Sequence, residues 1–584
     1  MEIDSPLDTI VEEREALMVS ANGGLSTRRK AHFLKPTTAI SSNGKISELP
    51  HDHVSPKPFI HGLKDLSEKV SFKGWRRSTQ KWKTWVHNMH AKHRALWKHV
   101  GIYDAVMSSR YDVKQHKELV LCFAEKWCLG TNSLVFPWGE ATITLEDVMI
   151  CGGFSVLGES VLRPLNSKLV EVEERLIKGR KEAARGGCVL ATSKAWMDYF
   201  MGTGNELEHE AFLSLWLSNF VFVSSASATS VRKHVFRIAI HLARGNRVAL
   251  APAVLCSIYR DLNLLKDRFS GSVVAQSNEL VYIYAPFQLV QVWVWERFPA
   301  LRPTPSSISH GEPRVSRWNR LKVNVPNFYG DEEQHVLIDS RVHLDEQIHS
   351  FARCLRGSEL VGLDSIEQYV PHRVSMQFGM DQDLPGCFAR CNGNPDIAWR
   401  NYSRPIRDAV LYVPPRLFES DVTSQYWHWW KQSVVAYRDA IKPFLKRPRN
   451  RRKHDVSVKE KVFKGNSSKE KEDEEVEAGD FIQKATCSTK EVEALAETKA
   501  NTKRCAVSTE ITDKDVEKTE YVPKLDAEVT KNANPIGESK GLVTDDVKSK
   551  PGPKMEKALT LLIFSPLVLS SNLGFAGLKN GSLS

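Results

Sequence analysis

Residues 134–153 read LVFPWGEATITLEDVMICGG, and the fold can be inferred outward from this stretch. Leu134–Phe136 and Ala141–Ile143 are short runs rich in β-forming residues on either side of a Pro/Gly turn, which predicts a β-hairpin. Thr144 with an acidic residue three positions later is typical of a capped helix start, and Gly152–Gly153 predicts the helix end. The stretch therefore predicts a small hairpin that leads directly into a short helix.

The surrounding signals are mostly helical. Two sets of apolar residues recur at helical spacing, one before the hairpin and one near the end of the block. The sets are Trp75, Trp82, Trp85, Met89 and Leu96, then Trp427, Trp430, Val434, Tyr437 and Ile441. Pro371 is placed as a first helical residue, and Gly379 lies just past the expected end of that helix. We expect a mainly α fold, an α-dominated α+β domain with a small β-hairpin.

Tryptophan marks the boundaries of that domain. All 15 tryptophans lie between Trp75 and Trp430, and a segment without large aromatics has little apolar area to bury. We expect a flexible leader over residues 1–63 and a single large domain over residues 64–445. A basic run over residues 446–454 and a disordered charged tail over residues 455–584 follow it, so both flanking segments are expected to lack a core.

Composition and apolar patterning argue against a secreted or membrane-spanning protein. The chain has 584 residues, 41% hydrophobic and 26% charged, and a net charge of +11. This basic excess permits a nucleic-acid partner without requiring one. The start is acidic and has no apolar run of a secretory signal. The longest apolar stretch, Leu559–Leu569, is too short to span a bilayer, so we expect a soluble intracellular protein with no membrane association.

Five ordered strings resemble the plant mobile domain, a family also described as aminotransferase-like, and are similar to the MAINTENANCE OF MERISTEMS-like proteins. The strings are Phe123–Trp127 with Phe136–Val148, Ala249–Leu262, Phe287–Pro299, Ile366–Val374 with Gln377–Gly379 and Asp381–Pro385, and Val422–Lys431. Together they span about residues 75 to 440.

The resemblance implies a nuclear plant protein with a transposon-derived or transposon-shared domain. Such proteins act in transposable-element and gene silencing, genome stability and meristem maintenance, with chromatin as their setting. It also implies a phosphatase-like protein partner, since some family members carry a fused phosphatase domain or work with one. This sequence has no phosphatase metal signature such as GDxHG or GNHE, so we expect the domain without the phosphatase.

The densest polar cluster is the strongest candidate site. It comprises His372, Arg373, Gln377, Asp381 and Asp383. One interpretation is a phosphate, nucleic-acid or metal site, with the two carboxylates holding a hard cation as in nucleases. The other, which we favour, is a buried polar network that fixes a helix end and the following turn. We therefore assign no catalytic residue and no metal ligand, and a metal at Asp381 and Asp383 stays an open alternative.

Other chemistries have less support. No GxSxG, GxxxxGK[ST], GxGxxG or HExxH motif occurs, and Cys387 and Cys391 have no second close pair to complete a zinc site. A pyridoxal-phosphate enzyme would need a Schiff-base lysine and a phosphate-binding loop, and neither is recognisable. We expect no cofactor and no small-molecule substrate.

Two segments are candidates for nucleic-acid contact or import. Basic residues alternate with Trp75, Trp82, Trp85 and Trp97 over residues 73–98, although the regular spacing favours burial of these rings in the core. Six of the eight residues in the run 446–453 are basic, which is typical of a nuclear-import signal. Its basic residues are Lys446, Arg447, Arg449, Arg451, Arg452 and Lys453.

Three functions remain open from the sequence. The first is a nuclear, non-enzymatic silencing factor that works through protein contacts and possible DNA contacts. The alternative is a domesticated transposon protein with DNA-binding or nuclease-type chemistry, and the third is a pyridoxal-phosphate aminotransferase. We expect the first.

Overall fold

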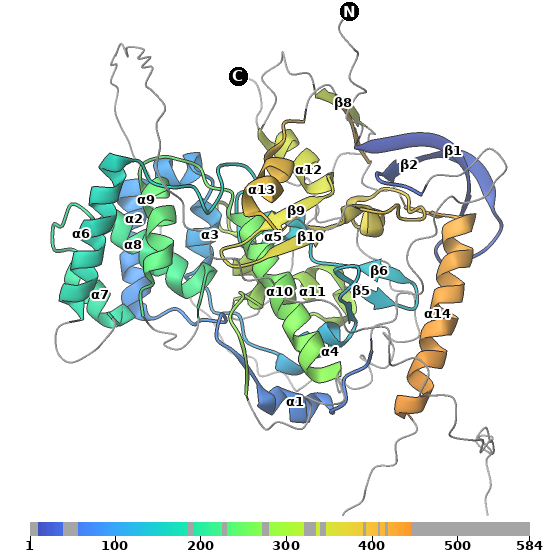
Figure 1. Cartoon of the computed structure of the whole chain (residues 1–584), viewed down its shortest axis with the longest axis horizontal. Coiled ribbons are helices and arrows are strands. Elements are labelled where there is room, and N and C mark those ends of the chain that lie inside the picture. The colour runs from blue at the N-terminus through green and yellow to red at the C-terminus, as the bar shows by residue number, and fades with distance from the viewer. Residues whose placement is uncertain are drawn as a thin grey trace, which may run out of the picture. The chain divides into compact units, whose positions relative to one another are not determined.

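The computed structural model describes residues 10–38, 57–184, 191–224, 230–270, 280–319, 334–338, 346–388, 393–406, 409–414 and 419–445. All of them lie within one compact unit of the chain. Helices dominate this unit and the sheets are small (Figure 1), as the sequence predicts.

The α-helices are α1 (Leu63–Lys69), α2 (Gln80–His99), α3 (Tyr103–Ser108), α4 (Lys117–Glu125), α5 (Leu145–Gly152), α6 (Ser167–Ala183), α7 (Ser193–Phe200), α8 (Glu208–Trp216), α9 (Phe236–Ala243), α10 (Leu250–Ser270), α11 (Gln288–Arg297), α12 (Glu346–Leu355), α13 (Pro395–Ser403) and α14 (Ser424–Leu445). Shorter turns of other helix types are η1 (Leu217–Val221), η2 (Lys233–Val235), η3 (Pro299–Leu301), η4 (Arg314–Trp318) and η5 (Pro371–Phe378).

The strands form five small sheets within the described residues. Antiparallel sheets pair β1 (Val11–Val19) with β2 (Thr27–Leu34) and β12 (Val422–Thr423), and β5 (Ser133–Phe136) with β4 (Trp127–Cys128) and β6 (Gly139–Ala141). Antiparallel pairs join β9 (Ser358–Val361) to β10 (Ile366–Tyr369) and β8 (Gln334–Ile338) to β11 (Ala409–Val413), and a parallel pair joins β3 (Val70–Phe72) to β7 (Val281–Ile283).

The stretch over residues 134–153 folds as its sequence predicts. β5 and β6 form the hairpin, and α5 follows directly with Thr144 and Asp147 in a reciprocal capping box. α5 packs against α10, α11, α12 and η4, which makes this short helix a hub of the core. In place of the single helix expected after Pro371, the chain forms the 3₁₀ segment η5, which is kinked at the non-helical Val374. It ends, as predicted, at Gly379 in the left-handed conformation.

The tryptophans of α2 point into the core. Trp82, Trp85 and Trp97 are at most 3% exposed, and their indole N–H groups donate to Ser109, Glu208 and His209 respectively. These three rings are therefore packing residues and cannot stack on a nucleic-acid base.

The N-terminal segment differs from the expected flexible leader over residues 1–63. Residues 11–34 form the β1–β2 hairpin, and β1 pairs with β12 at the far end of the sequence, where α14 begins (Figure 1). Met18, Ala31 and Phe33 of the hairpin are fully buried. The sequence did not reveal this order because the strand that pairs with β1 lies more than four hundred residues away, so no local pattern records it. Residues 1–9 and 39–56 lie outside the described residues.

A second, smaller apolar cluster fixes the start of α14. Tyr426, Trp429 and Trp430 pack with Val19 of β1 and Val135 of β5. These aromatic residues of α14 therefore lie against both the β1–β2 and the β5–β6 hairpins. The basic run over residues 446–454 and the tail over residues 455–584 lie outside the described residues. None of the helices that the structure describes combines the length and apolarity needed to cross a membrane.

Gly153 offers a test of this packing. It ends α5 with φ +73°, and a Cβ there would lie 2.5 Å from the backbone nitrogen of Ala105 in α3. Gly153→Ala should cost about 1–2 kcal/mol from the left-handed backbone and about 1–3 kcal/mol more from overpacking. Gly202→Ala is the matched control, because Gly202 has φ +70° but no atom within 4 Å of its Cβ position. Urea unfolding midpoints should rank the parent above Gly202→Ala and Gly202→Ala well above Gly153→Ala. Equal losses would contradict the tight α3–α5 contact.

Candidate functional site

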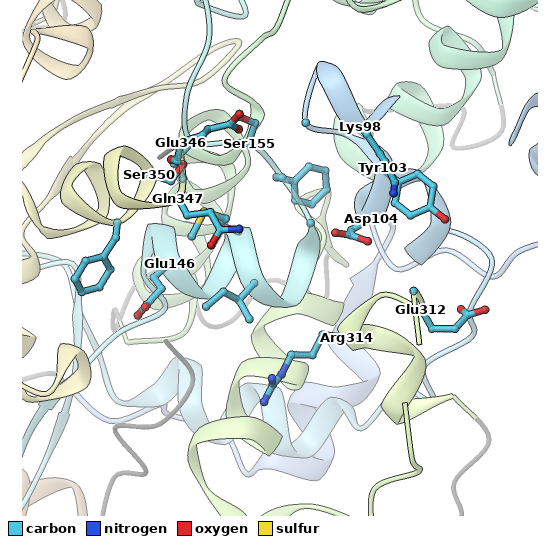
Figure 2. Close-up of a pocket in the computed structure, with 18 residues that line it drawn as sticks. Lys98, Tyr103, Asp104, Glu146, Ser155, Glu312, Arg314, Glu346, Gln347 and Ser350 are labelled. Atoms are coloured by element: carbon cyan, nitrogen blue, oxygen red, sulfur yellow. The ribbon is translucent and has the colours of Figure 1, made fainter. Parts of the chain in front are cut away.

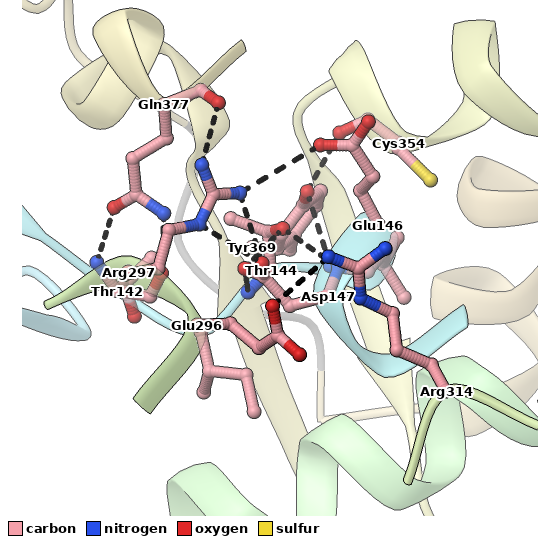
Figure 3. Close-up of polar contacts among 12 residues, drawn as sticks. Thr142, Thr144, Glu146, Asp147, Glu296, Arg297, Arg314, Cys354, Tyr369 and Gln377 are labelled. Atoms are coloured by element: carbon pink, nitrogen blue, oxygen red, sulfur yellow. Dashed lines mark hydrogen bonds and ion pairs between the residues drawn. The ribbon is translucent and has the colours of Figure 1, made fainter. Parts of the chain in front are cut away.

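A buried ion pair lies at the centre of the fold. The side chain of Arg297, at the end of α11, is completely buried. Its Nη2 and Nε lie 2.9 and 3.2 Å from Oδ1 of Asp147, and its Nη1 donates to the backbone carbonyl of Gln377 at 3.0 Å (Figure 3). Burial lowers the pKa of Arg297, but the charges of Asp147 and Glu146 outweigh it and raise the pKa overall. The guanidinium is therefore held as a charged group inside the protein.

Asp147 has a second role in the same place. Its Oδ2 accepts hydrogen bonds from the backbone N–H of Thr144 at 2.9 Å and from the Thr144 hydroxyl at 2.8 Å. One carboxylate thus caps α5 and neutralises Arg297. The sequence revealed the cap but not the ion pair, because the cap is local and Arg297 is 150 residues away.

Glu296 organises a neighbouring set of contacts. Its carboxylate accepts from Trp318 Nε1 at 2.9 Å, from Arg314 at 2.9 Å and from Arg317 at 3.3 Å. These bonds attach η4 to the end of α11. Glu296 and Arg297 lie in the family string Phe287–Pro299, but the sequence did not predict a role for either residue. The signal that could have found them is a pair of opposite charges inside the apolar run over residues 287–299.

The predicted polar cluster does not form one site. Arg373 and Gln377 face the β5–β6 hairpin, where Arg373 Nε lies 3.0 Å from Glu140. The Gln377 amide accepts from the backbone N–H of Thr142 and donates to its carbonyl, both at 2.8 Å. The side chain of Gln377 therefore extends the hairpin as another strand residue would.

Asp381 and Asp383 face the N-terminal hairpin instead. Asp381 is fully buried, and the guanidinium of Arg29 forms two parallel bonds to its carboxylate, at 3.0 and 2.7 Å. Backbone N–H groups of His32 and Asp421 complete its shell at 3.2 and 2.9 Å. These contacts make Asp381 the junction of β2 with the segment that precedes β12.

Asp383 is bound in the same way. It accepts from Arg14 of β1 and, at 2.7 Å, from the hydroxyl of Thr423. That hydroxyl in turn accepts from the backbone N–H of Tyr426 at 3.1 Å, at the start of α14. Both carboxylates are therefore bound to cations and donors of the chain itself, in the arrangement of a structural network.

His372 points elsewhere again. Its ring lies 3.2 Å from the carbonyl of Gly386, and burial, followed by the charge of Arg373, lowers its pKa to about 3. The imidazole is neutral at physiological pH. The described ranges contain no group of three or more His, Cys, Asp or Glu side chains placed to hold a metal ion.

A cavity of about 650 Å³ borders the buried ion pair. Figure 2 shows Lys98, Tyr103 and Asp104 on one side of it, and Glu146 with Gln347 and Ser350 on the other. Burial raises the pKa of Glu146 to about 8, although Arg297 at 3.8 Å acts in the opposite direction. Burial also raises the pKa of Asp104.

This cavity can hold a polar ligand beside a neutral acid. At pH 7 the Glu146 carboxyl carries a proton and is able to donate a hydrogen bond into the cavity. Lys98, Asp104, Ser155 and Ser350 also line the cavity. A ligand there would therefore meet cationic, acidic and hydroxyl groups.

Comparison with known proteins bears on these observations. The profile of the family described as plant mobile domain matches residues 101–431. The chain is 23% identical over 368 residues to a serine/threonine-protein phosphatase 7 long form homolog of Arabidopsis thaliana, covering 54% of this chain and 26% of that protein. It is 24% identical over 294 residues to Protein MAIN-LIKE 2 of the same plant, covering 46% and 42% respectively. The chain thus spans less than half the length of either relative, and no solved structure matches it significantly.

The two neighbouring acids of α5 should respond oppositely to neutralisation. Asp147→Asn leaves Arg297 buried without its anion, which should cost about 3–5 kcal/mol of unfolding free energy. Glu146→Gln replaces a carboxyl that is already protonated at pH 7, so its stability there should match or exceed that of the parent. Chemical denaturation of both variants at pH 7 measures this contrast. Equal destabilisation would contradict the assignment of Asp147 as the counterion.

The pH dependence provides a second readout of Glu146. Burial raises the pKa of Glu146 in the folded state to about 8, from the ordinary glutamate value of 4.5. The folded state therefore binds more protons than the unfolded state between these values, and stability should fall as the pH rises from about 4.5 to 8. Glu146→Gln should flatten this slope, and an unchanged slope would show that the carboxyl titrates normally.

The hairpin junction predicts a coupling energy. In a double-mutant cycle, Arg29→Gln and Asp381→Asn should couple by about 2–3 kcal/mol, because the pair is bidentate and one partner is fully buried. The control cycle uses Lys30 and Glu13 of the same hairpin, an exposed pair 2.5 Å apart that should couple by less than about 1 kcal/mol. Similar values in the two cycles would contradict the junction.

Proposed function

The chain belongs to the plant mobile domain family, as its motifs predicted, and from this premise we propose that it is a nuclear, non-enzymatic factor in the silencing of transposable elements and genes. The wider roles that we propose with it are genome stability and meristem maintenance. It would act at chromatin through contacts with other proteins.

One observation carries the non-enzymatic part of the proposal. Three charged residues of the family strings bind other parts of the same chain: Asp147 pairs with Arg297, Arg373 with Glu140, and Asp381 with Arg29. A catalytic group instead needs at least one atom directed at a substrate. The family motifs are thus accounted for by folding, and the surface of the domain remains for partners.

A phosphatase-type protein is the partner we propose. The support is a relative that is itself a serine/threonine-protein phosphatase 7 long form homolog. A domain that shares a chain with such an enzyme in one protein is well suited to bind that kind of enzyme as a separate protein.

The alternatives have less support in the described residues. Nuclease-type chemistry would require Asp381 and Asp383 to leave Arg29 and Arg14. Among the lysines, burial lowers the pKa of Lys266 to about 7, a property of Schiff-base lysines. However, its ammonium donates to the carbonyl of Glu125 and lies over the ring of Phe59, away from both large cavities.

Nuclear import is the testable part of this proposal. A tagged chain with Arg447, Arg449, Arg451 and Arg452 changed to Ala should move from nucleus to cytoplasm in plant cells, because the 66.0 kDa chain is large for passive entry and the run follows α14 directly. Fluorescence microscopy of the tagged protein, with a melting curve to confirm folding, measures the shift.

The control variant changes a second short basic run, Arg28–Lys30. Arg28 and Lys30 to Ala should leave the protein nuclear, because this run lies in β2, where Lys30 is already paired with Glu13. A cytoplasmic parent protein would overturn the proposed nuclear role. A quadruple variant that stays nuclear would assign import to another segment or to a carrier partner.

A further inference from the structure

A second large cavity lies away from the site described above. Its volume is about 740 Å³, and it is lined by α6, by η2 and the start of α9, by α10 and by the turn between β9 and β10. Figure 1 shows α6 and α9 beside each other in the helical part of the fold. No string of the family resemblance predicted this cavity.

Positive charge dominates its lining. Five cationic side chains face two carboxylates across it. The cations are Arg180, Arg232, Lys233, Arg237 and Arg260, and the carboxylates are Glu173 and Asp364. Three separate segments supply the five cations: α6, the stretch over residues 232–237, and α10. Their convergence is therefore a property of the fold.

Both carboxylates are already used. Arg260 Nη1 lies 2.5 and 2.7 Å from the two oxygens of Asp364, and Arg237 lies 3.6 Å from Glu173. Arg180 donates only to a neutral group, the carbonyl of Val231, at 2.9 Å. The side chain of Lys233 makes no hydrogen bond or ion pair with any residue that the structure describes, although its backbone carbonyl accepts from the N–H of Phe236. Arg232 donates to the carbonyl of Ser224 at 3.4 Å. Among the lining residues that the structure describes, the cations therefore outnumber the carboxylates.

The cations also repel each other. Burial, and then the charge of Arg232, lowers the pKa of Arg180. An anion between the two guanidinium groups would remove this repulsion and accept bidentate hydrogen bonds, for which the planar guanidinium is well shaped. Beside the charges, Phe222, Val223 and Leu363 give the cavity an apolar wall, against which the uncharged part of a ligand can pack.

We propose that this cavity binds a phosphate-bearing ligand of about nucleotide size. Arg180 and Arg232 hold the phosphate, Lys233 adds a third charge, and the apolar wall receives the remainder of the ligand. The volume falls in the range of pockets that enclose small organic ligands. The proposal is independent of the nuclear role, because it rests on the cavity alone.

The test is calorimetric titration of the full chain with ATP and, separately, with pyrophosphate. A salt concentration of about 150 mM screens weak binding to the net positive surface. Arg180→Gln with Arg232→Gln and Lys233→Gln should weaken binding at least about tenfold. Lys178→Gln is the matched control, since Lys178 is an exposed cation of the same helix that does not line the cavity, and it should bind as the parent does.

Two single variants keep the test independent of folding. Lys233→Glu changes an exposed side chain and should weaken binding without changing the melting temperature. Arg180→Lys keeps the positive charge but loses the bidentate guanidinium, so its affinity for the ligand should lie between those of the parent and of Arg180→Gln. Unchanged affinity in both would overturn the proposal.

A third titration distinguishes the source of the phosphate. A 5′-phosphorylated single-stranded oligonucleotide that competes with ATP, and loses affinity in the triple variant, would assign the site to a nucleic-acid end. Binding of ATP without such competition would assign it to a free nucleotide. No binding of any of the three probes, or binding that the triple variant retains, would overturn the proposal.

Discussion

The buried charge of Arg297 is the constraint on which the rest of this fold depends. A guanidinium without solvent needs an anion and neutral acceptors, and here they come from two distant parts of the chain. α5 supplies the carboxylate of Asp147 and the carboxyl of Glu146, and η5 supplies the carbonyl of Gln377. Since Asp147 also caps α5, the position of that helix and the charge balance of the core are set together. Moving α5, α11 or η5 separately would leave an ion or a helix end unsatisfied, at a cost of several kcal/mol. The three elements therefore fold as one unit.

The same logic explains why the family strings resemble active-site motifs without forming an active site. Charged residues inside apolar strings are unusual enough to attract functional interpretation. In this fold several of them neutralise one another: Arg373 binds Glu140, and Asp381 binds Arg29. Gln377 goes further and bonds to both backbone groups of Thr142 with its amide. A sequence constrained in this way specifies a fold precisely, and it leaves ligand contacts to the cavities and the surface.

The sequence predicts the features that depend on neighbouring residues. The β5–β6 hairpin, the Thr144 cap, the end at Gly379 and the buried face of α2 follow from turns, caps and helical spacing within about twenty residues. The sequence does not predict contacts between residues that lie far apart in the chain. The leader is a hairpin because Arg14 and Arg29 meet Asp383 and Asp381, more than 350 positions later. The cationic cavity is likewise assembled from segments that are individually unremarkable, so no stretch of sequence is basic enough to reveal it.

The two ends of the described domain share one set of contacts, and this has a consequence for the chain beyond it. β1 pairs with β12, Arg29 binds both Asp381 and Asp421, and Thr423 links Asp383 to the first turn of α14. The direction in which α14 leaves the domain is therefore set by the N-terminal hairpin rather than by the helix itself. A partner that binds the hairpin and separates it from Asp381 would change both ends of the domain at once, because no charge in this junction belongs to one end alone.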